Sequence, residues 1–317
     1  MSPPSPLPGT LSLDHLGVIV KALDAGASCW ERLGFRLTRA SPQMGLDSNG
    51  RRYERWATAN RCAVFRRGYL ELIGVEAPGR VNPWAAFLER FEGPHLLALR
   101  CADAVVARHA LGDGACWFDP PVERRREAPY RDGTAEMRFR NVFSRDPLVP
   151  ECRYIVIEHQ TPEVLWERSV QVHPNGAHSL LEGLCRAPAE PAARAAVRAR
   201  WEALARVGGR MTDARNGFWL DFPDGTRIGC LDRDAMDARF PGAQASQRAF
   251  VTACQVGVTS LDAAAQCLDG AGVTVARTRI EGTGPERLWV APDEANGLVV
   301  EFVETPFPAA AAGGREA

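Results

Sequence analysis

Two histidines and one glutamate of this chain stand in apolar, strand-like segments, where an ionisable side chain is costly unless a partner or ligand compensates it. His15 lies in the segment Leu13–Val20, and His95 lies near the start of a similar segment about 80 residues later. Glu71 lies in an apolar strand between them. Two imidazoles and a carboxylate are ligands that a divalent metal takes in proteins. These residue types and their spacing predict a metal site.

A fourth ligand is expected from the strand Tyr154–His159. Neighbouring residues of a strand point to opposite faces, and a bulge can shift this alternation. The residues alone therefore leave two alternatives open, Glu158 and His159. Asn60 and Trp166 are candidates for lining the cavity beside the site, and structural roles fit them equally well.

The elements that must position these side chains recur four times along the chain. Each unit has a strand, a helix that ends at a glycine and further strands, and it spans roughly 60 to 80 residues. The predicted helices begin near Asp24, Ala104, Glu190 and Ser260. Units of this kind pair into cupped sheets with the helices outside. We therefore predict an α+β fold of four βαβββ modules paired into two cupped-sheet domains, residues 11–168 and 169–305.

Three further segments carry expectations that the structure can test. A short strand is predicted around Phe35–Leu37. Ser41–Glu54 and Glu123–Asp132 are expected to be loops that set the size of the cavity. The run Arg124–Arg126 inside the second loop is interpreted as solvated charge rather than a phosphate clamp.

Composition excludes several classes of partner. The 317 residues carry a formal net charge of -1, so no electrostatic field favours nucleic acid or an anionic membrane. No apolar run is long enough to span a bilayer. No hydrolase elbow, P-loop or dinucleotide fingerprint occurs. A small-molecule substrate remains the expected partner.

The cysteines and the chain ends suggest a cytoplasmic protein. Nine cysteines occur singly, with no C-x-x-C pair, which favours small core residues in a reducing compartment. The first residues have no basic region followed by an apolar stretch, so they are not expected to be a signal peptide. Residues 1–10 and 306–317 are expected to be disordered.

The chain resembles the vicinal oxygen chelate superfamily, which contains glyoxalase I, extradiol dioxygenases and bleomycin-resistance proteins. The resemblance spans nearly the whole chain and is sharper in the first half. Within that superfamily, the chain resembles the glyoxalase-like domain family through Leu13-Asp14-His15, Thr58-Ala59-Asn60-Arg61, Tyr69-Leu70-Glu71-Leu72-Ile73, Glu158-His159-Gln160-Thr161-Pro162-Glu163 and His173-Pro174-Asn175-Gly176-Ala177. The resemblance implies metal ligands at His15, Glu71 and His95, and it favours His159 over Glu158 as the fourth.

The ligand number implies the reaction. Four protein ligands on an octahedral ion leave two positions for vicinal substrate oxygens, and the metal then stabilises an enediolate while a carboxylate, Glu71 or Glu158, moves the proton. This predicts an isomerase or lyase of glyoxalase type with one divalent ion, Fe, Mn, Ni or Zn. Three ligands would instead suit an extradiol-type iron dioxygenase. A metal-free binding or resistance protein that uses the same cavity is the other alternative.

The second pair of units lacks a complete ligand set. His178 and Glu301 are present, but the closing strand of the third unit and the opening strand of the fourth unit offer no ligand. His178 is therefore expected to be a hydrogen-bonded core residue. We expect this half to be a scaffold, a dimer mimic or a lid, and the protein to be a monomer or homodimer.

Overall fold

The computed structural model describes residues 8–112, 115–145, 148–244, 248–279 and 285–307. Its strands form two eight-stranded sheets, each built from two units of strand, helix and three strands. The predicted fold class is therefore confirmed. The first sheet uses residues 12–159 and the second uses residues 177–304, while the domain boundaries expected from the sequence remain a prediction.

The first sheet has the order β2-β3-β4-β1-β5-β8-β7-β6. Its strands are β1 (Ser12–Val20), β2 (Ser41–Leu46), β3 (Tyr53–Val64), β4 (Tyr69–Val75), β5 (Gly93–Arg100), β6 (Val122–Tyr130), β7 (Gly133–Phe143) and β8 (Arg153–His159). The opening strands β1 and β5 lie antiparallel at the centre, and each runs parallel to the closing strand of its own unit. This arrangement gives the sheet a local two-fold symmetry that relates the first unit to the second.

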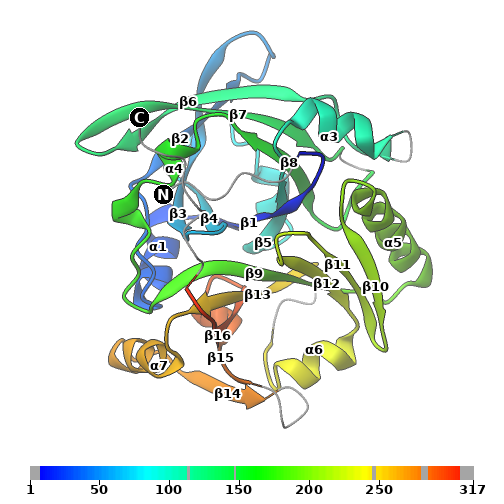
Figure 1. Cartoon of the computed structure of the whole chain (residues 1–317). Coiled ribbons are helices and arrows are strands. Elements are labelled where there is room, and N and C mark those ends of the chain that lie inside the picture. Colours follow the sequence, from blue (N-terminus) through cyan, green and yellow to red (C-terminus); the bar gives the residue numbers. More distant parts are fainter. Residues whose placement is uncertain (1–7, 113–114, 146–147, 245–247, 280–284, 308–317) are drawn as a thin grey trace, which may run out of the picture.

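The second sheet repeats this arrangement in the order β10-β11-β12-β9-β13-β16-β15-β14. Its strands are β9 (Ala177–Arg186), β10 (Arg210–Ala214), β11 (Gly217–Asp221), β12 (Arg227–Leu231), β13 (Val251–Val258), β14 (Val275–Arg279), β15 (Glu286–Val290) and β16 (Val299–Glu304). The two sheets contact each other through their central strands, and Figure 1 shows β1 and β5 beside β9 and β13.

Amphipathic helices cover the outer faces of the sheets. They are α1 (Leu23–Arg32), α3 (Ala104–Leu111), α5 (Pro191–Ala205) and α7 (Leu261–Gly270), close to the predicted ranges. In α1 the buried residues Leu23, Ala27 and Trp30 recur at helical spacing, which fixes the face that packs on the sheet. Asp103 and Ser260 cap α3 and α7, because their side-chain oxygens accept hydrogen bonds from the first free backbone N–H groups.

Shorter helices connect or cover the sheets. They are α2 (Ala85–Leu88), α4 (Pro162–Leu165) and α6 (Arg233–Arg239), with 3-10 turns at Arg168–Val170 and Pro292–Glu294. Among the described residues no helix is long and apolar enough to cross a membrane. All nine cysteines are free, and six of them are buried, as the sequence predicts.

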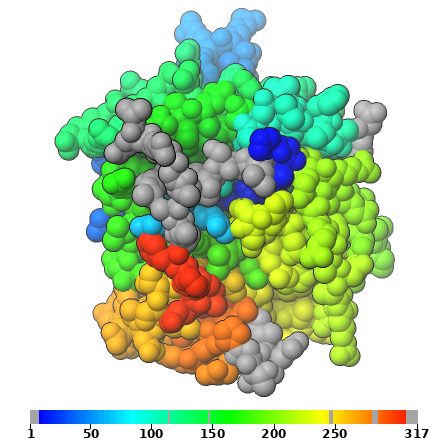
Figure 2. Space-filling view, viewed as in Figure 1, coloured from blue at the N-terminus to red at the C-terminus, as the bar shows by residue number. Residues whose placement is uncertain are grey.

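Two expected loops are strands in the structure. Ser41–Glu54 contains β2 and the start of β3, and Glu123–Asp132 contains most of β6, whereas Phe35–Leu37 is not a strand. The tip between β2 and β3 projects from the rest of the molecule in Figure 2. The edge strands β2 and β6 approach each other, and the Tyr53 hydroxyl donates to the Arg125 carbonyl at 2.7 Å. The first sheet therefore curls into a nearly closed barrel.

The expected disorder of the chain ends falls largely outside the described residues, which begin at residue 8 and end at residue 307.

Candidate active site

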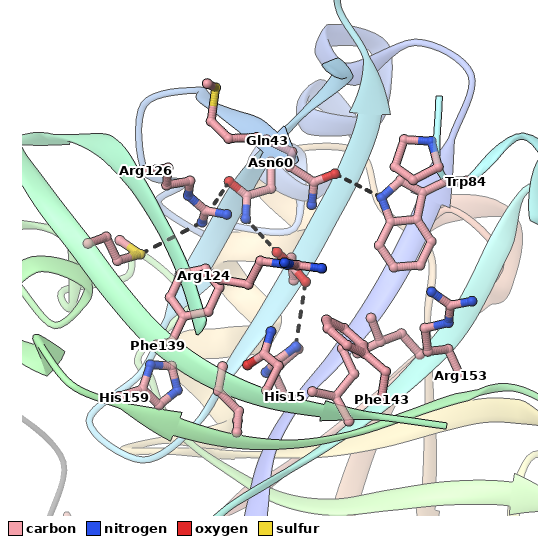
Figure 3. A pocket seen from close by; sticks show the side chains of 18 of the residues that line it. His15, Gln43, Asn60, Trp84, Arg124, Arg126, Phe139, Phe143, Arg153 and His159 are labelled. Atoms are coloured by element: carbon pink, nitrogen blue, oxygen red, sulfur yellow. Dashed lines mark hydrogen bonds and ion pairs between the residues drawn. The ribbon is translucent and has the colours of Figure 1, made fainter. Parts of the chain in front are cut away.

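The concave face of the first sheet, here called the first cup, encloses a cavity of about 600 Å³. This size is usual for a small-molecule site. Figure 3 shows the side chains that converge on it from several strands. The lining includes His15, Asn60, Glu71, Trp84, Leu96, Arg124, Arg126, Phe139, Phe143, Arg153, Ile155, Ile157 and His159.

A chain of charged contacts lies at the base of this cavity. His15 Nδ1 donates to Asp14 Oδ2 at 2.8 Å, and His15 Nε2 lies 3.5 Å from Glu71 Oε2. The imidazole stacks on the Tyr69 ring at 4.3 Å between ring centroids. Because β1 and β4 run parallel with His15 beside Tyr69, the side chain of Glu71 lies two residues further along the same face. The sheet thus places one imidazole between two carboxylates.

The two carboxylates hold His15 in its charged form. Burial by itself lowers the pKa of His15, but the hydrogen bonds and charges of Asp14 and Glu71 outweigh burial and raise that pKa to about 9. Burial also opposes ionisation of Glu71, yet the contacts with His15 and Asn60 keep its pKa below the ordinary value. The pKa of Asp14 is likewise lowered, because its contacts with His159 and His15 overcome burial. At neutral pH the base of the cavity therefore holds an imidazolium and two carboxylates.

Asn60 fixes the orientation of Glu71. It lies on β3, which pairs with β4, and its side-chain amide donates to Glu71 Oε1. Arg126 of β6 donates to Asn60 Oδ1 at 3.3 Å. Asn60 therefore lines the cavity as the sequence suggested, and it links Glu71 to a guanidinium.

His159 also reaches the cavity, but it contacts Asp14 rather than Glu71. Its Nε2 donates to Asp14 Oδ2 at 3.0 Å, and its ring meets the Trp166 ring edge to face at 4.9 Å. Trp166 does not line the cavity. Its indole N–H donates to the Phe65 carbonyl at 3.0 Å, so Trp166 packs behind His159 as a structural residue.

The other two expected site residues lie elsewhere. His95 stacks on Phe91 at 3.9 Å between centroids and its Nε2 bonds to the Phe91 carbonyl, while its neighbour Leu96 faces the cavity. Glu158 accepts from the backbone N–H of Ala104 at the start of α3 and from Arg140. Both residues are one position out of phase with the cup, because successive side chains of a strand alternate between its faces. The expected ligand role of His95 and the catalytic role of Glu158 are therefore corrected.

The local symmetry of the sheet tests the fit of a metal ion. His15 lies beside Tyr69, and Glu71 is two residues beyond it; in the second unit Leu96 lies beside Arg153, and Ile155 is two residues beyond it. The positions that correspond to the His15 and Glu71 pair are thus aliphatic. Among the described residues no group of three or more His, Cys, Asp or Glu side chains is arranged to hold a metal ion. The donor set does not fit the four-ligand centre that the resemblance implies.

Two arginines of the cavity were missed by the sequence interpretation. Along β6, Arg124 and Arg126 point inward and are half-buried, while Arg125 between them is exposed. The alternation of side chains along a strand would place Arg124 and Arg126 on one face and Arg125 on the other. The sequence interpretation instead treats this run of arginines as part of a loop. The arginine run contributes two cations to the cavity.

The corresponding face of the second sheet, here called the second cup, is closed. Glu301 is fully buried and contacts Arg239, Arg287 and Gln255. Arg239 belongs to α6, whose Met236, together with Phe240, packs on this face. His178 is buried and bonds to Ser179 and to the Thr305 carbonyl, which confirms its predicted role as a core residue.

Comparison with known proteins gives the family. The glyoxalase-like domain family matches residues 13–204, more than half of the chain, and no curated protein matches the sequence. The fold is similar to that of a hypothetical protein from Staphylococcus aureus, with a TM-score of 0.57 and 10% identity over 93% of this chain and 100% of that one. It is also similar to the 2,3-dioxygenase LapB from Pseudomonas sp. KL28, with a TM-score of 0.53 and 15% identity over 95% of each chain.

A variant of 4-hydroxymandelate synthase from Streptomyces coelicolor has a TM-score of 0.50 and 13% identity over 98% of this chain and 95% of that one. At these identities the likeness concerns the fold alone. The motifs around His15 and Glu71, the paired units and the family match agree with one another. The chain belongs to the glyoxalase-like domain family.

Proposed function

We propose that the first cup is the active site of an enzyme that moves a proton on a small molecule, as an isomerase or lyase does. The observation that carries the proposal is the position of the His15 ring, whose two nitrogens face Asp14 and Glu71 at the base of the cavity. An ionised base beside a fixed hydrogen-bond donor suits proton abstraction next to a carbonyl group, because the donor stabilises the enolate oxygen that forms.

Glu71 is the base in this proposal. Its carboxylate is ionised, and Asn60 holds one of its oxygens, so the other oxygen is oriented toward the cavity side of His15. It takes a proton from a carbon of the substrate, and the C–H electron pair moves to the adjacent carbonyl oxygen. Return of the proton to a neighbouring carbon completes an isomerisation, and expulsion of a leaving group completes an elimination.

His15 is the electrophile. The 3.5 Å separation between its Nε2 and Glu71 Oε2 is long for a hydrogen bond, so a substrate oxygen that enters the cavity can replace Glu71 as the acceptor of this N–H. Asp14 accepts the Nδ1 proton and keeps the ring charged and oriented. Stacking on Tyr69 fixes the plane of the ring.

Glu71 and His15 carry out these steps with their own side chains. His15 Nε2 and Glu71 are two donors that face each other, and the two corresponding positions are Leu96 and Ile155. His159 is a second histidine on this face, but its Nε2 is bonded to Asp14 and does not face the pair formed by His15 and Glu71. A glyoxalase-type centre needs a second pair of ligands. The observed donor set favours proton transfer by the side chains themselves.

Deuterium exchange tests this proposal. Carbon acids of graded size, such as 2-oxo acids, ketones and aldehydes, are incubated with the enzyme in D₂O, and loss of the α-proton signal is followed by ¹H NMR. We expect exchange of at least one member, a decrease of about 10³-fold in Glu71→Gln, and no change in Glu158→Gln. Exchange should persist after dialysis against a chelator. Exchange that is unaffected by Glu71→Gln would contradict the assignment.

A metal-free binding protein is the second candidate, because the cavity is lined by aromatic and aliphatic side chains that would retain a ligand without reaction. Tight binding of a compound whose protons never exchange would favour this alternative.

A further inference from the structure

We propose that the substrate is an acid with an apolar body, whose anionic group binds Arg124 and Arg126 close to the reacting carbon. The inference deepens the proposed function and rests on it only for the position of the reacting carbon. The existence of an anion site is independent of catalysis and is argued from the charges of the cavity.

The ionisable side chains that line the cavity do not balance. Its carboxylates are Glu71 and Asp119. Glu71 faces the imidazolium of His15, and Asp119 accepts from Arg145 at 2.6 Å. Neither Arg124 nor Arg126 forms an ion pair with a carboxylate anywhere in the part of the chain that the structure describes. Arg124 and Arg126 therefore lie without a paired carboxylate in a partly buried space.

The guanidinium of Arg126 is held in place without being neutralised. Its Nη2 donates to Asn60 Oδ1 and contacts Met137 Sδ at 3.8 Å, while its Nε is buried and has no hydrogen-bond partner among the described residues. A buried donor without an acceptor is costly unless a ligand supplies one. The guanidinium of Arg124 lies 5.8 Å from the Phe143 ring centroid and donates only weakly, at 3.4 Å, to a backbone carbonyl.

Both arginines come from one strand that exposes the residue between them. Their side chains enter the cavity because β6 pairs with β7 over its whole length and alternates between its faces. Two guanidinium groups two residues apart on one face form a paired donor surface that suits a carboxylate or phosphonate. Figure 3 shows both arginines on the side of the cavity where Asn60 lies.

The position of this pair relates the anionic group to the chemistry. Arg126 donates to Asn60, and Asn60 donates to Glu71, so one amide separates the guanidinium from the base. An anion bound there lies beside the reacting carbon. The rest of the substrate must extend over the apolar wall formed by Leu96, Ile155, Ile157, Phe139 and Phe143. This order, anion, reacting carbon and apolar body, defines the substrate class.

Binding of a matched pair of probes tests the inference. 1-Naphthylacetate carries a carboxylate next to an aromatic body, and 1-naphthylacetamide is its neutral isostere. Titration calorimetry with the full-length protein should give an affinity at least 10-fold higher for the acid, since a charge-assisted contact contributes at least about 1.4 kcal/mol. Acetate, which lacks the body, should bind far more weakly than either.

Substitutions then assign the preference to its residues. Arg124→Met and Arg126→Met should each reduce the preference for the acid, and the double variant should abolish it. Arg138→Met removes the same charge from the adjacent strand, where Arg138 is exposed and outside the cavity lining, and should leave the preference intact. Equal affinity for acid and amide in the wild type, or a preference that survives in the double variant, would overturn the inference. Binding without proton exchange would instead count against the proposed function alone.

Discussion

The two cups of this molecule share a topology and differ in how each treats its central carboxylate. In the first cup Glu71 lies beside a charged imidazole at the base of a cavity, and in the second cup Glu301 is bonded by Arg239, Arg287 and Gln255. The base of the first cup stays accessible to a ligand. In the second cup α6 covers the sheet and the arginine enters the space that a ligand would use.

The difference shows how one fold supports either a site or a scaffold. A buried carboxylate needs compensation in both cups. The imidazole of His15 lies 3.5 Å from Glu71 and leaves room for a ligand beside the carboxylate. The guanidinium groups of Arg239 and Arg287 instead occupy the acceptor positions of Glu301. Ionisable residues in corresponding strands therefore do not by themselves indicate corresponding functions.

Substitution of each central glutamate by glutamine is the strongest test of the difference between the two cups. Glu71→Gln should reduce proton exchange by about 10³-fold and cost less stability than Glu301→Gln, because His15 keeps Asp14 as its counter-charge and Gln keeps the bond to Asn60. Glu301→Gln should leave the exchange rate unchanged but cost about 3–5 kcal/mol, because Arg239 and Arg287 lose their buried counter-charge. NMR exchange rates and urea unfolding of both variants check the contrast. Equal losses of stability would show that both carboxylates are structural.

Removing the arginine that closes the second cup tests the role of α6. Arg239→Met should lower the free energy of unfolding by about 3 kcal/mol, since it leaves Glu301 and Glu182 without their shared partner. The control is Arg233→Met in the same helix, whose exposed pair with Asp237 should contribute less than about 0.5 kcal/mol. Similar effects of the two substitutions would contradict the assigned role of Arg239.

Two added ligands in the first cup test whether the missing pair explains why the donor set does not fit a metal ion. In Leu96→His/Ile155→Glu the second unit gains the pair that His15 and Glu71 form in the first, so affinity for Zn²⁺ or Mn²⁺ should rise on the order of 100-fold. Dialysis followed by elemental analysis measures the gain. The same double substitution combined with Glu71→Gln should lose most of it. If the wild-type protein already retained one equivalent of metal, the conclusion that its donor set does not fit a metal centre would be wrong.

His15 and His95 should make the stability of the protein depend on pH in opposite directions. The pKa of His15 is raised to about 9, so the folded state holds its proton more tightly than the unfolded chain, whose histidine titrates near 6.5. This stabilisation, about 3 kcal/mol, is complete below pH 6.5 and is lost as pH rises through 9. His15→Gln should therefore flatten the alkaline side of the stability profile.

His95 provides the contrast, because burial lowers its pKa to about 4. The unfolded chain then binds the proton first, so stability falls as pH drops below 6.5 toward 4. His95→Gln should flatten the acid side only. Urea unfolding of both variants between pH 4 and pH 9.5 separates the two effects, and identical profiles would contradict both assignments.

Several features could be read from the sequence with good accuracy. The four helices, the paired units and the position of Glu71 beside His15 follow from apolar patterns, capping residues and glycine stops. His95 and Glu158 could not be placed, because one residue of phase in a strand decides which face a side chain occupies. Register shifts in the β1–β5 pairing occur at Leu13/His15 and Gly17/Val18, and sequence patterns do not locate them.

The sequence by itself determined the family, the repeated architecture and the first pair of site residues, because these depend on local periodicity and on motifs within single strands. Only the tertiary structure decided which cup is open, that Asp14 and Asn60 complete the site, and that Arg124 and Arg126 enter it. Those outcomes depend on strand phase and on contacts between residues far apart in the chain, such as Asp14 with His159 and Arg239 with Glu301. Such contacts are set by the packing of whole units, which no single segment encodes.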